Sequence, residues 1–151
     1  MKHAFFLPAV MLAAALPFGA QADTPVHPAY LHALSDLRAA RADLGHKAGN
    51  DPVSQQEDKA IAEIDDAATA IKRIAKADQK GLYNKPVEDA HLDHAGRLHH
   101  AEDLLKQAQN DLAQREDNPE AKTLQRHAVA HVQAALHATE IAINDIEHGA
   151  H

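Results

Sequence analysis

Residues 93–112 read DHAGRLHHAEDLLKQAQNDL, and the spacing of the apolar side chains in this stretch decides the fold class. Leu98, Leu105 and Leu112 follow one another at intervals of seven residues, with Ala101 and Ala108 between them. Spacings of three, four and seven place side chains on one face of an α-helix. The stretch is therefore predicted to be an amphipathic helix that buries its leucine face against other helices.

Three other stretches have an apolar face of the same kind. One begins near Pro28, because proline suits the first turn of a helix, and ends at Gly45. Another begins with Ser54-x-x-Glu57, which has the pattern of a capping box, and ends at Gly81.

The last stretch begins at Asn118, which is expected to cap the helix, with Pro119 at the first helical position. It continues through apolar residues that include Val132 and Ile143 and ends before Gly149. Four amphipathic helices with no predicted strand indicate an all-α fold. We expect an antiparallel up-down-up-down four-helix bundle.

This topology would bring most of the histidines to one end of the molecule. The start of the first and third helices and the end of the second and fourth lie together in an up-down bundle. The histidines expected at that end are His27, His32, His91, His94, His99, His100, His148 and His151. His46 is expected at the far end, and His127 and His131 nearer the other half.

Residues 1–22 have the pattern of a secretory signal peptide. A basic start at Lys2 precedes an apolar run, and Ala20-Gln21-Ala22 matches a small-x-small cleavage site. The run is shorter than the ~20 residues that a spanning helix needs, so no stable membrane anchor is expected after cleavage. Residues 23–151 are predicted to be a single domain that is periplasmic or secreted.

Composition excludes several classes of function. The chain of 151 residues has no Cys, which excludes thiol catalysis, disulfides and covalent c-type haem. Its net charge of −7 argues against nucleic-acid binding, which draws on clustered cations. No catalytic constellation is identifiable, so we do not expect an enzyme. The notable feature is 13 His.

These imidazoles predict that the protein binds or buffers a transition metal at one end of the bundle. Neutral imidazole is a common ligand of zinc, Cu(II) and nickel, and a pair at i, i+4 offers two nitrogens to one ion. The candidate ligands are His27, His32, His91, His94, His99, His127 and His131. Asp36 and Asp103 follow His32 and His99 by four residues and are candidate carboxylate ligands or partners of a ligating ring.

Two alternatives need no such metal site. The first is a pH-responsive interaction or stress module, because 12 histidines remain after the signal peptide is removed. Their titration would take the net charge from −8 toward +4. The second is a bundle that binds haem non-covalently through two histidines. Any single His–carboxylate pair can also be an ordinary solvated pair on a helix surface.

Residues 27–38, HPAYLHALSDLR, form a distinctive motif, followed later by Arg97-Leu98-His99 and by EDNP at residues 116–119. The chain resembles a group of small secreted bacterial helical proteins with no assigned activity. The resemblance implies a periplasmic helical bundle and carries over no catalytic residue. If the motif marks a site, the matching residues are His27, Tyr30, His32, Asp36 and His99.

Overall fold

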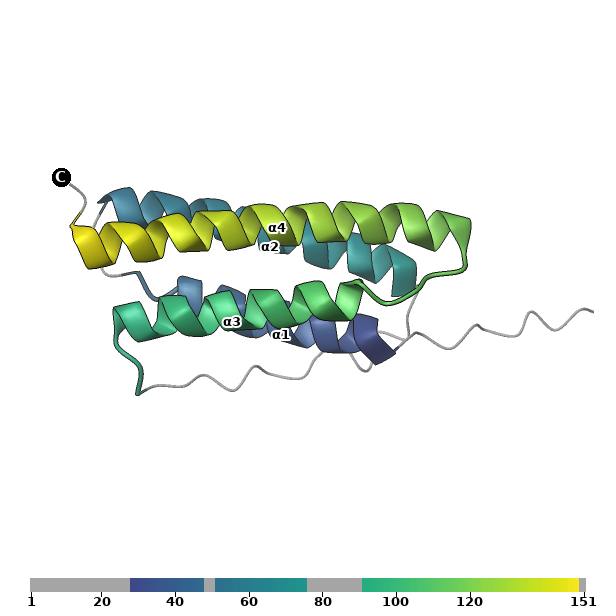
Figure 1. The fold of residues 1–151 in the computed structure, drawn as a ribbon, viewed down its shortest axis with the longest axis horizontal. Coiled ribbons are helices and arrows are strands. Elements are labelled where there is room, and N and C mark those ends of the chain that lie inside the picture. Colours follow the sequence, from purple (N-terminus) through teal and green to yellow (C-terminus); the bar gives the residue numbers. More distant parts are fainter. Residues whose placement is uncertain (1–27, 48–50, 76–90, 150–151) are drawn as a thin grey trace, which may run out of the picture.

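The fold is taken from a computed structural model, which describes residues 28–47, 51–75 and 91–149. The predicted signal peptide at 1–22 lies outside the described residues, as do His27, His151 and the predicted helix end at Gly81. The described chain forms α1 (Pro28–Leu44), α2 (Asp51–Ala75), α3 (His94–Leu112) and α4 (Pro119–His148) (Figure 1). No strand occurs within these ranges, so the predicted all-α fold with four helices is confirmed.

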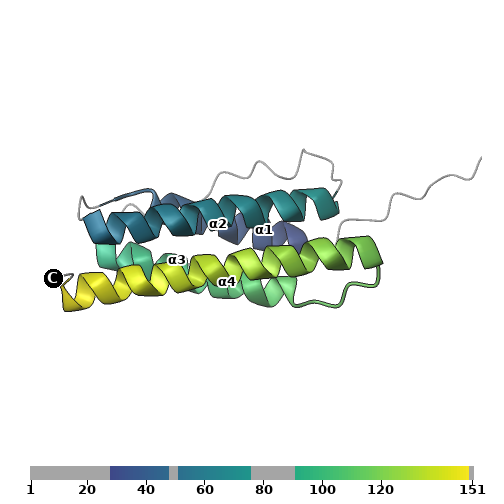
Figure 2. The ribbon, with the colours of Figure 1, turned by 90° about the horizontal axis from the view of Figure 1, so that it is seen from above.

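The direction of the helices differs from the prediction. In Figures 1 and 2, α2 and α3 run the same way, and α1 and α4 run the opposite way. The contacts agree, because His94 at the start of α3 meets Glu57 near the start of α2. The antiparallel up-down-up-down topology is therefore wrong, and the order is up-down-down-up.

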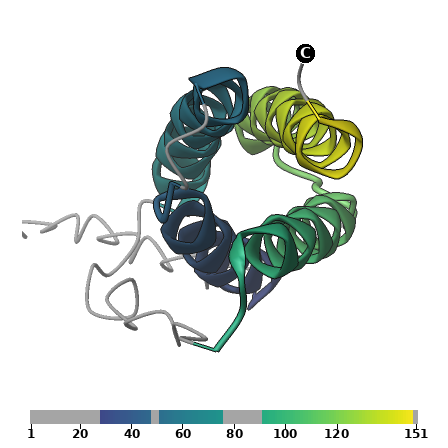
Figure 3. The ribbon, with the colours of Figure 1, turned by 90° about the vertical axis from the view of Figure 1, so that its left-hand side faces the viewer.

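Helices α2 and α3 lie diagonally opposite each other in the bundle. Helix α1 packs against α2 and α3, and α4 packs against the same two helices, which is visible end-on in Figure 3. Residues 76–93 join α2 to α3. A chain of that length reaches up to about 60 Å, whereas α2 is only about 37 Å long, so the chain can return to the end where α2 began. Bundles with one long crossover connection have this order.

Local signals at the helix ends are mostly confirmed. The Asp93 carboxylate accepts a hydrogen bond from the Gly96 N–H at 2.7 Å, and the Asn118 side chain accepts from the Glu120 N–H at 3.0 Å. Gly149 ends α4 with φ 69°, a conformation that favours glycine. The predicted capping box is wrong, because α2 begins at Asp51 and Ser54 lies inside it.

The core is built from leucine, isoleucine, valine and alanine. Leu34, Leu37, Leu98, Leu105 and Leu112 are almost completely buried, as predicted. Fully buried alanines recur at intervals of seven residues on both α2 and α4, and such small side chains let helix axes approach closely. These alanines are Ala60, Ala67, Ala128, Ala135 and Ala142. Within the described ranges, every helix is too short or too polar to cross a membrane.

Candidate functional site

The observed topology gathers six histidines at one end of the bundle, which we call the histidine end. It is formed by the end of α1, the starts of α2 and α3, and the end of α4 (Figure 1). Its imidazoles are His46, His91, His94, His99, His100 and His148. The prediction was wrong for two residues, because His32 near the start of α1 lies at the opposite end, whereas His46 lies here.

His94 and Glu57 form the most buried pair at the histidine end. The His94 Nε2 atom lies 2.5 Å from Glu57 Oε1, and the two side chains are 11% and 0% exposed. A carboxylate without solvent needs a compensating charge or a proton of its own. The hydrogen bond to His94 is therefore the interaction that compensates the burial of the Glu57 side chain.

His100 reaches the last turn of α1. Its Nδ1 atom lies 2.9 Å from Asp43 Oδ2, and the Asp43 side chain is only 7% exposed. Burial raises the pKa of Asp43, and His100 opposes this rise by favouring the ionised carboxylate. His100, together with His46 and Arg97, therefore offsets part of the cost of burying this carboxylate.

His99 reaches the last turn of α4. Its Nε2 atom lies 2.9 Å from Glu147 Oε1, and both side chains are about half exposed, at 50% and 47%. The hydrogen bond to Glu147 raises the pKa of His99, and Glu102 on α3 acts in the same direction. Water screens this pair, so it is weaker than the two buried ones.

These three histidines radiate from the first two turns of α3. At about 100° per residue, His99 and His100 are rotated from His94 by roughly 140° and 240° around the helix. One helix start therefore contacts α2, α4 and α1 through three imidazoles. A fourth interhelical pair lies farther along the bundle, where His131 Nδ1 of α4 is 2.7 Å from Glu63 Oε2 of α2.

Buried polar atoms without a hydrogen-bond partner also gather at the histidine end. Within the described ranges these atoms are Gln56 Oε1, Glu57 Oε2, His94 Nδ1 and Arg97 Nε. The Arg97 guanidinium uses its other nitrogens to donate to the carbonyls of Leu92 at 2.7 Å and His46 at 3.1 Å. Native interiors satisfy nearly all such atoms, so these four atoms make the histidine end the least satisfied polar part of the described core.

The predicted metal ligands are not assembled around one point. Within the part of the chain that the structure describes, no group of three or more His, Asp or Glu side chains is placed to hold a metal ion. His91 precedes the cap of α3, so it does not form a helical i, i+3 pair with His94. His127 and Asp103 are exposed on α4 and α3.

Asp36 lies away from the histidine end, beside α3. Burial raises the pKa of Asp36, and the nearby Asp111 adds to the rise, whereas His32 opposes it. The predicted interaction between His32 and Asp36 is thus present as an electrostatic one. His99, another of the five residues that matched the motif, lies at the opposite end.

Sequence reasoning missed the acidic partners on the other helices. The histidines form ion pairs with Asp43, Glu57, Glu63 and Glu147. None of these carboxylates was a candidate site residue. Glu57 does carry a signal, because it lies four residues after Val53 and three before Ala60, within the apolar face of α2. A carboxylate at a core position indicates a buried partner.

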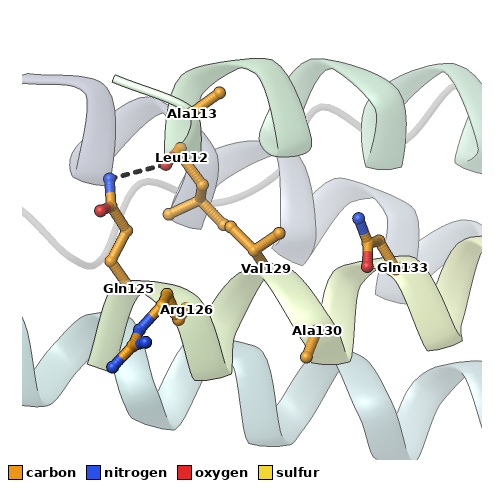
Figure 4. A pocket seen from close by; sticks show the side chains of 7 residues that line it. All are labelled: Leu112, Ala113, Gln125, Arg126, Val129, Ala130 and Gln133. Carbon is orange, nitrogen blue, oxygen red and sulfur yellow. Dashed lines mark hydrogen bonds between the residues drawn. The ribbon is translucent and has the colours of Figure 1, made fainter. Parts of the chain in front are cut away.

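The opposite end of the bundle has a different character. The Tyr30 hydroxyl donates to Glu116 Oε2 at 2.5 Å, and burial together with this carboxylate raises the pKa of Tyr30. A cavity of about 240 Å³ between α3 and α4 is floored by Leu112 and Val129 (Figure 4). Gln125 borders it and donates to the Leu112 carbonyl at 2.7 Å. This cavity contains none of the predicted site residues.

At the histidine end, three imidazoles from α3 are therefore paired with carboxylates of the three other helices. Comparison with protein-family models, curated proteins and solved structures finds no match to this chain.

Proposed function

We propose that this protein is an exported helical module whose packing responds to pH through its histidine–carboxylate pairs. The observation that carries the proposal is that the first two turns of α3 are bound to each of the other three helices through an imidazole. Imidazole is the side chain whose ordinary pKa lies nearest neutral pH, and the pKa of His99 is raised by its hydrogen bond to Glu147, so the contact between α3 and α4 depends on pH. The apolar run and cleavage pattern of residues 1–22 support export.

The direction of the response follows from two shifted groups. The raised pKa of His99 means that its pair stabilises the fold below the ordinary histidine value and is lost as pH rises through the shifted one. The raised pKa of Asp43 means that ionisation of this carboxylate costs stability as pH rises above the ordinary aspartate range. The His99 pair therefore tightens the histidine end in mild acid and is lost toward alkaline pH, whereas the cost at Asp43 sets in from the ordinary aspartate range upward.

This loosening is the proposed signal. When α3 is released, the starts of α2 and α3 present the buried polar atoms and the adjacent apolar face to a partner or to another copy of the chain. Hydrogen exchange at pH 5.5 and pH 8, corrected for intrinsic rates, tests this step. We expect the first turns of α3 to lose protection at pH 8 relative to the middle of α4. Equal changes in the two regions would contradict the proposal.

The His99 pair allows a measurement of one contact. Replacing His99 with Gln is expected to reduce the free energy of unfolding by about 0.2–1 kcal/mol at pH 5.5 and by almost nothing at pH 8.5. Urea unfolding at both values measures the difference. His127→Gln is the matched control, since His127 is also an exposed helical histidine. A loss of the same size at both pH values would show that His99 does not act through its charge.

Binding or buffering of a transition metal is the second candidate function. The gathering of six imidazoles at the histidine end, with the buried Nδ1 of His94 unbonded, supports it. Calorimetric titration with Zn²⁺, Cu²⁺ and Ni²⁺ is expected to give a dissociation constant below ~10 μM for at least one ion. His91→Gln should weaken that site, whereas His127→Gln should not. The protein must be purified without a metal-affinity step, and weaker binding of all three ions would reject this candidate.

A further inference from the structure

Two histidines lie one turn apart in the first half of α4. His127 and His131 are separated by four residues within a continuous helix, which places their Cβ atoms about 5–6 Å apart. His127 is exposed and the His131 side chain is 38% exposed, so solvent reaches both residues. Neither belongs to the histidine end, because His131 lies roughly 25 Å along α4 from His148.

Glu63 of α2 engages one nitrogen of the His131 ring. The His131 Nδ1 atom lies 2.7 Å from Glu63 Oε2, and the Glu63 side chain is 28% exposed. An ionised carboxylate can only accept a hydrogen bond, so Nδ1 is the donor. In the neutral ring, Nε2 is then the nitrogen with a free lone pair. Within the described ranges, no other hydrogen bond or ion pair involves the ring of His131 or that of His127.

We propose that His127 and His131 bind a divalent transition-metal ion, preferentially Cu²⁺, and that Glu63 positions the His131 ring for this role. A histidine that binds a metal almost always donates its other ring N–H to a carboxylate, a carbonyl or water, which orients the ring and raises the basicity of the ligating nitrogen. For a given set of nitrogen ligands, Cu²⁺ is the first-row divalent ion that binds most tightly. Its tetragonal geometry accepts two imidazoles, with water in the remaining positions.

The role of Glu63 is to act through the ring and not as a ligand. This agrees with the finding that, among the described residues, no group of three or more His, Asp or Glu side chains is placed to hold a metal ion. An ion held by two imidazoles and by water stays open to solvent, unlike the closed four-ligand sites that stabilise folds. The site therefore suits reversible uptake of the ion. It is separate from the metal candidate at the histidine end and does not depend on the pH response.

Titration of the protein with Cu²⁺ at about pH 7.5, where imidazole is largely neutral, tests the proposal. Bound Cu²⁺ is paramagnetic and broadens the backbone amide NMR signals of nearby residues. We expect broadening at residues 124–134 of α4 and 60–66 of α2, with a dissociation constant of about 10 μM or tighter. Zn²⁺ should bind there at least roughly tenfold more weakly, and Mg²⁺ should not bind. Broadening confined to the histidine end would overturn the proposal.

Two substitutions separate the ligand from the positioning residue. His127→Gln should weaken Cu²⁺ binding to α4 by at least roughly tenfold, because only one imidazole remains. Glu63→Gln should weaken it by about 10–100-fold, because the carboxylate that orients His131 is lost. Unchanged affinity in His127→Gln would reject the site, and unchanged affinity in Glu63→Gln would reject the positioning role.

The same helix offers matched controls. His137 and Glu140 form another histidine–carboxylate pair on α4, but no histidine lies four residues from His137. His137→Gln and Glu140→Gln should therefore leave Cu²⁺ binding at His127 unchanged, as should His91→Gln at the histidine end. Urea unfolding midpoints of all these variants establish that they are folded. A loss in the control variants equal to that in His127→Gln would show that the binding is not specific to this pair.

Discussion

Replacing His94 with leucine is expected to reduce the free energy of unfolding by about 3–5 kcal/mol at neutral pH. The reason is the fate of Glu57, whose side chain is 0% exposed and whose hydrogen bond runs to His94. Without the imidazole, the carboxylate must remain buried without a partner or take up a proton. Either outcome costs much more than the loss of one exposed pair.

Urea unfolding of the single and double variants separates the charge from the packing. Replacing both residues, with Glu57→Leu added to His94→Leu, should recover most of the lost stability, because two apolar side chains need no compensating charge. A loss below about 1 kcal/mol in His94→Leu would show that the pair carries little of the stability.

Shortening Leu105 to alanine is expected to destabilise the fold by about 2–5 kcal/mol. Leu105 is 0% exposed and belongs to the leucine row that decided the fold class. Around it, the core consists largely of alanine and leucine, whose short side chains cannot extend to fill the cavity left behind. The cost should therefore lie toward the upper part of that range.

Leu31 provides the matched control for this measurement. It is the exposed large apolar residue of α1, with 39% of its surface accessible. Leu31→Ala should change the free energy of unfolding by no more than about 0.5 kcal/mol. Both variants should unfold with an unchanged dependence on denaturant, since the surface buried by the fold is nearly the same. Similar losses in the two variants would contradict the packing described for α3.

The helices themselves were predictable because their signals are local. Asp93 and Asn118 cap α3 and α4 through side-chain oxygens, and Gly149 ends α4 with a positive φ. Each of these interactions joins residues within four positions of one another. The spacing of Leu98, Leu105 and Leu112 is equally local, so it identified the buried face of α3.

The topology and the pairs were not predictable in the same way. A connection as long as residues 76–93 permits α3 to run either parallel or antiparallel to α2, and nothing in its composition chooses between them. The pairs depend on that choice, because His94 and Glu57 are 37 residues apart and His100 and Asp43 are 57 apart. The sequence pattern instead favoured partners four residues away on the same helix, which is why Asp103 was expected to act with His99.

In three of the interhelical pairs, the histidine comes from one half of the bundle and the carboxylate comes from the other half. His94, His100 and His131 all come from the α3–α4 hairpin, and their partners Glu57, Asp43 and Glu63 all come from the α1–α2 hairpin. One half of the bundle thus supplies the bases and the other half the acids. Two copies of the same half would set like groups against each other, so these pairs favour the association of each half with its correct mate.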